Sequence, residues 1–117
     1  MIEGVDCCFT NSLYQIDKDR VIVGEYKSFC LVNIDKCIRE KIIEDESIGH
    51  VFCFLKLRYN NTILCGCDNE IFFYDMNTKQ YKITKNKHNY YISDLLLIDD
   101  NTFLSCSWDS TIKVWKY

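Results

Sequence analysis

Short apolar runs separated by polar turns recur along the chain, and they do so in pairs. Three pairs stand out: 21–24 with 28–33, 62–67 with 70–74, and 103–107 with 111–115. Short runs that are rich in β-branched and aromatic residues are typical of strands, and two such runs joined by a polar turn are typical of a hairpin. The pattern therefore predicts three β-hairpins.

Each predicted hairpin has further apolar runs beside it. One run precedes every hairpin (12–16, 51–57 and 92–98), and another follows the first two (37–43 and 80–83). Residues 37–43 also fit an amphipathic helix, with Ile38, Ile42 and Ile43 on one side. We predict a strand there, because 80–83 takes the same place after the second hairpin. The repeating unit is thus expected to have four strands.

The sequence repeats itself with a period of 41 or 42 residues. Shifted by 41 positions, residues 61–75 align with residues 102–116 without a gap, and this alignment places Cys65 on Cys106. A third copy, residues 19–33, fits 42 positions upstream of the second. Self-similarity at a fixed period indicates a repeat protein in which each copy is one structural unit.

Several of the predicted strands are apolar almost throughout, among them 52–55, 71–74 and 95–98. A sheet with one face in water should instead alternate apolar and polar residues, so both faces of these sheets are expected to be covered. Four-stranded units that stack face to face at this period are typical of β-propeller blades. We therefore predict an all-β fold, a partial β-propeller of about three four-stranded antiparallel blades, with the last blade lacking its outer strand.

The predicted organisation is one partial propeller domain over residues 1–117. Its blades are expected at about 9–43, 48–84 and 88–117. Residues 2–9 are a candidate outer closing strand, which would require the two ends of the chain to meet. Three blades leave an apolar face exposed at each end, so we expect either part of a longer propeller or a unit that self-associates.

The last repeat carries a distinctive set of residues. His88 leads the innermost strand, and the second strand ends in Ser-Cys-Ser at 105–107. Asp109 occupies the tight turn, and the third strand ends in Trp115. This arrangement resembles the WD-repeat (tryptophan-aspartate repeat) β-propeller family. The resemblance identifies Trp115 as the signature tryptophan, with Lys116 where the family usually has aspartate.

The resemblance also implies a structural role for four side chains of the last repeat. In the family, the matching positions form a hydrogen-bonded tetrad. The turn aspartate holds the histidine, the histidine reaches the strand serine, and the serine reaches the indole N–H. The residues at these positions are His88, Ser105, Asp109 and Trp115.

The middle repeat resembles a degraded copy of the same motif. Tyr74-Asp75 takes the place of the tryptophan-aspartate pair, and Asp68 lies in the turn. Gly49-His50 resembles the family's Gly-His dipeptide, while Leu64 stands in place of the tetrad serine. The first repeat keeps only the hydrophobic pattern. The tetrad is therefore expected in the last blade alone.

Composition narrows the classes of function. The chain is 48% hydrophobic and 15% aromatic, which is ample for a folded core, and its net charge of -3 gives no general attraction to a phosphate backbone. No apolar run approaches the roughly 20 residues that span a bilayer. The start MIEGVDCC lacks the basic and apolar parts of a secretion signal. We therefore expect an intracellular protein, cytoplasmic or nuclear, that binds neither nucleic acid nor membrane.

Eight cysteines are scattered through apolar stretches. We expect them to be small core residues rather than disulfides, because no export signal places the chain in an oxidising compartment. The one close pair, Cys65 and Cys67, has no second cysteine or histidine pair at zinc-finger spacing. We expect no metal site. The sequence also contains no Gly-rich phosphate loop or other cofactor motif, so no cofactor is expected.

A basic stretch follows the second hairpin, and its lysines are Lys79, Lys82, Lys85 and Lys87. Two interpretations are open. The lysines suit a solvated strand edge, where their charge discourages edge-to-edge association. The other interpretation is a contact patch for an acidic partner, and we favour the solvated edge over it.

A catalytic alternative arises because serine, histidine and aspartate are also the components of a hydrolytic triad. The alternative is a hydrolase-like enzyme using Ser105, His88 and Asp109, or a cysteine paired with His50 or His88. The tetrad implied by the resemblance argues against it, since its members satisfy one another and leave no exposed nucleophile. We expect the protein not to be an enzyme.

The leading function is a non-enzymatic protein–protein interaction scaffold or adaptor, as the resemblance implies. Such blades present variable loops on rigid hairpins. The expected partners are other proteins, and exposed aromatic residues would be natural anchors. The candidate contacts are Tyr26, Tyr90, Tyr91 and Trp108. A further alternative is a fragment with no independent function.

Overall fold

The computed structural model describes residue 4 and residues 12–58, 60–84 and 87–117. Within these ranges the chain forms eleven β-strands and no helix. The strands are β1 (Ser12–Gln15), β2 (Arg20–Glu25), β3 (Ser28–Asn33), β4 (Ile38–Glu44), β5 (Cys53–Lys56), β6 (Thr62–Gly66), β7 (Ile71–Asp75), β8 (Tyr81–Ile83), β9 (Ile92–Asp99), β10 (Thr102–Ser107) and β11 (Ile112–Lys116).

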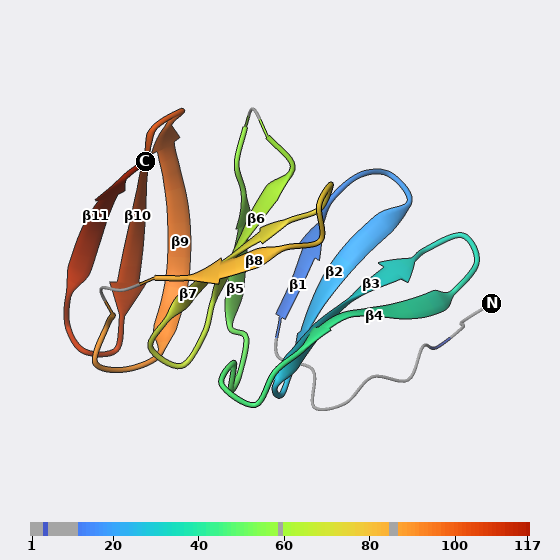
Figure 1. Cartoon of the computed structure of the whole chain (residues 1–117), viewed down its shortest axis with the longest axis horizontal. Coiled ribbons are helices and arrows are strands. Elements are labelled where there is room, and N and C mark those ends of the chain that lie inside the picture. The colour runs from blue at the N-terminus through green and yellow to red at the C-terminus, as the bar shows by residue number, and fades with distance from the viewer. Residues whose placement is uncertain (1–3, 5–11, 59, 85–86) are drawn as a thin grey trace.

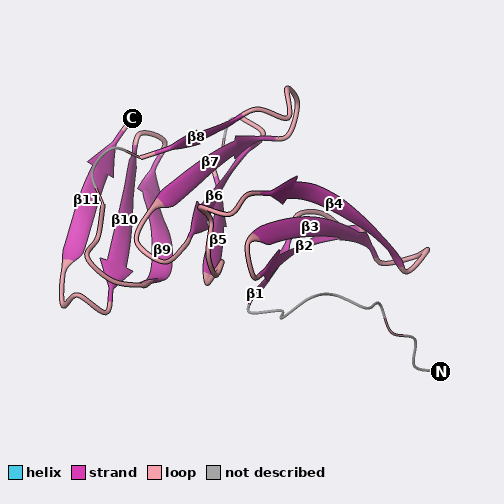
Figure 2. Cartoon of the chain, turned by 60° about the horizontal axis from the view of Figure 1, so that its bottom comes forward, coloured by secondary structure: helices cyan, strands magenta, loops and turns pink. Residues whose placement is uncertain are grey.

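The strands form three antiparallel sheets, which we call blades 1, 2 and 3. Their strand orders are β1-β2-β3-β4, β5-β6-β7-β8 and β11-β10-β9. The sheets stand side by side along the molecule (Figure 1), and a turned view separates them (Figure 2). The predicted fold class, an all-β partial propeller with three strands described in its last blade, is confirmed. The candidate closing strand at 2–9 falls, apart from Gly4, outside the described residues.

The segment with the ambiguous pattern is a strand. β4 pairs with β3, with Ile38 opposite Asn33 and Ile43 opposite Phe29. This ladder pairs backbone groups of β3 that a helix over 37–43 would leave to water. The position in the repeat therefore predicted this element correctly where the local periodicity was ambiguous.

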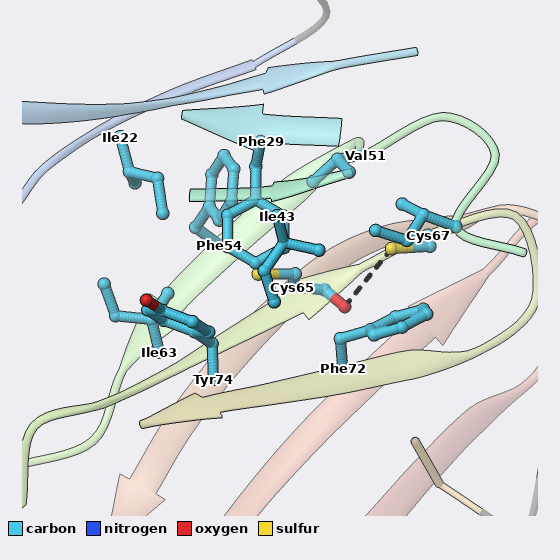
Figure 3. Close-up of a cluster of buried hydrophobic side chains, with 11 residues drawn as sticks. Ile22, Phe29, Ile43, Val51, Phe54, Ile63, Cys65, Cys67, Phe72 and Tyr74 are labelled. Atoms are coloured by element: carbon cyan, nitrogen blue, oxygen red, sulfur yellow. Dashed lines mark hydrogen bonds between the residues drawn. The ribbon is translucent and has the colours of Figure 1, made fainter. Parts of the chain in front are cut away.

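One hydrophobic core lies between blades 1 and 2 (Figure 3). Its buried side chains are Ile22, Phe29, Ile43, Ile48, Val51, Phe54, Ile63, Cys65, Cys67, Phe72 and Tyr74. The Phe29 ring meets Phe54 and Tyr74 edge-on, at centroid distances of 6.4 and 5.5 Å, an arrangement that aromatic pairs favour. The Cys67 thiol donates a weak hydrogen bond to the Cys65 carbonyl at 3.6 Å. This close cysteine pair is therefore part of the packing.

A second core lies between blades 2 and 3. Its buried side chains are Cys53, Leu57, Leu64, Ile71, Ile92, Leu95 and Phe103. Trp115 covers this core from β11, with its ring stacked on Phe103 at 5.8 Å and 6°. Blade 2 is thus packed on both faces. Its strands consequently need apolar residues on both sides, which explains their continuous apolar runs.

Two glycines allow neighbouring blades to approach closely. A Cβ at Gly24 would lie 2.7 Å from the Val51 carbonyl oxygen, and a Cβ at Gly66 would lie 2.8 Å from Ile92. These two contacts are equivalent, because Gly24 precedes Gly66 by one repeat and Val51 precedes Ile92 by one repeat. Each glycine therefore lets the chain at the start of the next blade touch the sheet.

The gapless alignment of the last two repeats is wrong in the second strand. In blade 2, Gly66 pairs with Ile71, but in blade 3 Cys106 pairs with Ile112, so the last hairpin has one extra residue in its turn. Cys106 therefore corresponds to Gly66, and Cys65 corresponds to Ser105. A shift of one residue in a strand moves each side chain to the opposite face, which is why the correction matters for the tetrad.

Candidate functional site

Four polar side chains of blade 3 form one hydrogen-bonded chain. Trp115 Nε1 donates to Ser105 Oγ at 2.8 Å. Ser105 Oγ lies 2.7 Å from His88 Nε2, and His88 Nδ1 lies 3.0 Å from Asp109 Oδ2. An indole N–H can only donate, so Ser105 accepts from Trp115. The two ring nitrogens of His88 connect the Ser105 hydroxyl to the Asp109 carboxylate, and Nδ1 also lies 3.0 Å from the Thr111 hydroxyl.

The turn of the last hairpin holds Asp109 in its ionised form. Its carboxylate accepts hydrogen bonds from the Thr111 hydroxyl and backbone N–H and from the Asn89 N–H at 2.8 Å. These bonds, the Thr111 hydroxyl first, lower the pKa of Asp109 well below its ordinary value. The carboxylate therefore clamps the loop before β9 to the β10–β11 turn.

The two middle members of the chain of four are buried on the side of blade 3 that packs against blade 2. His88 and Ser105 are each only 1% exposed, and the His88 N–H donates to the Asn69 carbonyl of blade 2 at 3.0 Å. The Ser105 hydroxyl is hydrogen-bonded to both Trp115 and His88. This arrangement satisfies buried polarity and does not present Ser105 as an exposed nucleophile.

Burial also argues against an enzyme with a cysteine nucleophile, as far as three of the thiols are concerned. Burial raises the pKa of Cys53 to about 12 and raises the pKa of Cys65 and Cys67 well above the ordinary value of a thiol. A cysteine nucleophile reacts as the thiolate, which these environments disfavour. No group of three potential metal ligands occurs within the described ranges.

Blade 2 has different residues at the tetrad positions. Cys65 takes the place of Ser105 and Tyr74 the place of Trp115. Asp68 keeps its place in the turn, where it accepts from the His50 backbone N–H at 3.3 Å and lies 3.7 Å from His50 Nδ1. The His50 ring is 40% exposed and does not enter the core. Gly49 allows this placement, since its φ of 66° suits glycine and a Cβ there would collide with Asp68.

A continuous row of aromatic rings crosses all three blades. We call it the aromatic row, and its members in spatial order are Tyr26, His50, Phe52, Tyr91, Tyr90 and Trp108. Neighbouring ring centroids lie 4.5 to 6.0 Å apart. The turns and loops that carry these residues lie along the lower edge of the molecule in Figure 1.

Backbone hydrogen bonds between loops hold the aromatic row in place. Tyr26 and His50 form an antiparallel bridge between blades 1 and 2. The Phe52 N–H donates to the Gly66 carbonyl at 2.8 Å, and the Trp108 N–H donates to the Tyr91 carbonyl at 3.0 Å. The rings are therefore presented by loops that are tied to the sheets rather than by free loop tips.

The four aromatic residues expected to contact partners all lie on this row. Tyr26, Tyr90 and Trp108 are 42%, 48% and 67% exposed, and Tyr91 is half-buried between Phe52 and Trp108. His50 and Phe52 complete the row and were not expected there. His50 resembles the histidine of the family's Gly-His dipeptide, which is buried in the family. Phe52 belongs to an apolar run that is typical of a buried strand.

The basic stretch and a cavity between the blades are further candidate binding sites, with fewer distinctive contacts than the aromatic row. Lys87 pairs with Glu70 at 2.7 Å, and Lys85 lies outside the described residues. A cavity of about 290 Å³ between blades 1 and 2 is lined by Arg20, Leu31, Glu40, Ile42, Tyr74, Met76 and Lys79.

The described part of the chain contains no helix that is long and apolar enough to cross a membrane.

Residues 79–116 match the family described as WD domain, G-beta repeat. The matched segment contains the complete hydrogen-bonded chain of His88, Ser105, Asp109 and Trp115. No curated protein matches the chain.

Several solved structures resemble the chain. Two are of an extracellular domain from B. thetaiotaomicron, described as belonging to a one component or a hybrid two component system; each is 22% identical, with TM-scores of 0.74 and 0.75. Each match covers 92% of this chain and 15% of that chain. A third is a chain of the Mitotic Checkpoint Complex, 16% identical with a TM-score of 0.73. That match covers 94% of this chain and 35% of the other. These identities show a shared fold alone, and the chain spans only a small part of each longer relative.

Proposed function

We propose that this chain, in which residues 79–116 form a WD repeat, is a non-enzymatic protein–protein interaction module that binds partner proteins through the aromatic row. The observation that carries the proposal is the continuity of the row over three blades. Exposed aromatic side chains are the commonest anchors of protein interfaces, and a contiguous exposed patch of them is unusual on a surface without a partner.

The rigidity of the row supports the same function. Binding to side chains that are already ordered costs less conformational entropy than binding to a loop that must first become ordered. Tyr91 is packed between Phe52 and Trp108 at centroid distances of 4.8 and 5.4 Å, so the middle of the row is already ordered. Its two ends, Tyr26 and Trp108, are left to contact a partner.

The polar residues of blade 3 favour a binding module over a hydrolase. Ser105, His88 and Asp109 use their hydrogen-bonding groups on one another and on Trp115 and Thr111. WD repeats are generally not enzymes, and a buried, mutually satisfied set suits a structural role. We further propose that the protein acts inside the cell, where thiols such as Cys53, Cys65 and Cys67 would stay reduced.

A second surface supports self-association. The face of blade 3 that points away from blade 2 exposes apolar side chains, namely Leu96, Ile98, Ile112 and Val114. In blades 1 and 2 the equivalent faces are covered by the next blade. We propose that a second copy of the chain covers this face. Sedimentation analysis tests it: Val114→Lys should lower the fraction of dimer, and a wild-type protein that stays monomeric at micromolar concentration would contradict it.

Affinity purification with quantitative mass spectrometry tests the interaction module. We compare the wild type with the double variant Tyr90→Ala, Trp108→Ala, and use Tyr81→Ala as a control, because Tyr81 is a similarly exposed aromatic outside the row. Specific partners should be depleted at least about tenfold by the double variant, as expected for loss of two anchors, and kept by the control. Equal recovery of every partner by all three proteins would contradict the proposal.

A further inference from the structure

We infer that the aromatic row binds an arginine-containing, extended segment of its partner, with guanidinium groups lying over the ring faces and pairing with carboxylates along the row. The inference rests on the proposed function of the same surface and adds the chemistry of the ligand.

One end of the row already holds a cation on a ring face. Lys27 Nζ lies 5.0 Å from the centroid of the Tyr26 ring, and it also pairs with Glu46. A cation over an aromatic ring with a carboxylate beside it is thus a stable arrangement on this surface. Farther along the row, the exposed carboxylate of Asp68 lies beside the His50 ring, and no lysine is among the contacts described for that pair.

Trp108 and Tyr90 are the two most exposed aromatic side chains of the row. Their rings are nearly parallel, at 16° and a centroid distance of 6.0 Å, and they are among the more exposed aromatic side chains in the described ranges. Tryptophan is the strongest aromatic partner for a cation, and arginine stacks on rings more often than lysine does. This end of the row is therefore where we place the main arginine contact.

Two exposed carboxylates lie beside the row. Asp68 lies beside His50 with 42% of its side chain exposed, and Glu46 lies beside Lys27 with 86% exposed. Asp109 follows Trp108 in the chain, and because its carboxylate is already hydrogen-bonded to His88, Thr111 and Asn89, it adds negative charge near the row but no free pairing group. A row of rings edged by negative charge is complementary to a positively charged segment and would repel an acidic one.

The row is long enough to meet more than one residue of an extended chain. In an extended peptide, side chains on the same side lie about 6.6 Å apart, twice the rise of one residue. Neighbouring rings of the row lie between 4.5 and 6.0 Å apart, which is somewhat closer. Arginines at every second residue would therefore meet the row at intervals slightly longer than one ring, while the intervening residues point away.

The direct test is fluorescence anisotropy with a labelled peptide of four glycine-arginine repeats. A matched peptide with citrulline in place of arginine keeps the shape and removes the charge. We expect the arginine peptide to bind at least about tenfold more tightly than the citrulline peptide, and Trp108→Ala to weaken that binding about tenfold. Asp68→Asn should weaken it about threefold. Equal binding of the two peptides would overturn the inference.

A charge-matched control distinguishes binding of the arginine peptide at the row from its nonspecific attraction to an acidic protein. Asp35→Asn removes one exposed carboxylate at the β3–β4 turn, away from the row. We expect this variant to bind the arginine peptide as the wild type does. An equal loss of binding in Asp35→Asn and Asp68→Asn, or full binding by Trp108→Ala, would show that net charge rather than the row attracts the peptide, and would overturn the inference.

The inference and the proposed function fail in different ways. If partners are depleted by the double variant Tyr90→Ala, Trp108→Ala but the wild type binds no arginine peptide, the interaction module stands and the cation inference is wrong. If the arginine peptide binds and needs Trp108, while the double variant keeps every partner, the cation site stands and the row is not the route to those partners. Thermal unfolding of each variant confirms that loss of binding is not loss of fold.

Discussion

Blades 2 and 3 have the same three inner strands but different chemistry at their centres. In blade 3, Ser105 is hydrogen-bonded to His88 and Trp115. In blade 2 the corresponding residue, Cys65, is fully buried among apolar side chains of the first core. A four-stranded unit of this kind can therefore be held by a buried polar network or by packing alone. The family match covers residues 79–116, which include this network. The polar residues of the network are therefore easier to recognise from sequence than the fold that blades 2 and 3 share.

The largest expected effect comes from removing the indole of blade 3. Trp115→Ala takes away the ring stacked on Phe103 and the donor to Ser105, and should lower the free energy of unfolding by about 3 kcal/mol. Trp115→Phe keeps a ring and loses only the donor, so it should cost about 1 kcal/mol. Urea unfolding measures both. Trp108→Ala is the matched control and should change stability by less than about 0.5 kcal/mol, because that side chain is largely exposed. A larger loss for Trp108→Ala than for Trp115→Ala would mean that the roles of the two tryptophans are reversed.

The two histidines provide the sharpest contrast between the blades. His88→Ala leaves Ser105 and Asp109 without their shared partner in a buried site and should lower the free energy of unfolding by about 2 kcal/mol. His50→Ala removes a half-exposed ring from the surface and should cost less than about 0.5 kcal/mol. The measurement is thermal unfolding of both variants. Similar losses would mean that blade 2 depends on its histidine as blade 3 does.

Exchanging the central residue tests the corrected alignment. Cys65→Ser places a hydroxyl among the apolar side chains of the first core, where no histidine or indole is positioned to pair with it, and should cost about 1.5 kcal/mol. Cys65→Ala removes the sulfur without adding polarity and serves as the control. If Cys65→Ser proved as stable as the wild type, blade 2 would have to contain a polar partner for that position.

Acid should weaken blade 3 through Asp109. The folded protein lowers the pKa of this carboxyl below its unfolded value, so the carboxylate stabilises the fold above about pH 4 and this contribution is lost as the pH falls below that value. Asp109→Asn lacks the titrating group. The stability difference between wild type and Asp109→Asn should therefore shrink between pH 7 and pH 3 in urea unfolding. A difference that stays constant over this range would contradict the role of the ionised carboxylate.

The strands could be predicted from the sequence because each is repeated. The apolar runs return every 41 or 42 residues, so an uncertain segment such as 37–43 could be assigned from its counterpart at 80–83. The register of the last hairpin could not be predicted in this way. A one-residue difference in a turn leaves the pattern of apolar residues almost unchanged, although it exchanges the faces of the strand that precedes it.

The aromatic row was predicted only in part for a different reason. Tyr26, Tyr90, Tyr91 and Trp108 stand in or near turns, where exposure is the ordinary expectation. Phe52 is one residue before β5 and looks like the start of a core strand. The position of His50 depends on a left-handed backbone conformation at Gly49 and on contact with Asp68, which is 18 residues away in the sequence. Such contacts across a turn are not visible in a local pattern.

The glycines at the blade interfaces have a consequence for how closely a further sheet can stack. Gly24 and Gly66 place no side chain between successive sheets, which lets the sheets approach closely at these points. At the corresponding position blade 3 has Cys106, whose side chain lies on the outward face of the sheet. Any sheet that stacks on that face meets a thiol where the first two interfaces offer no side chain. A sheet packed on this face should therefore stand farther away than at the first two interfaces, and Cys106→Gly would allow the closer approach seen there.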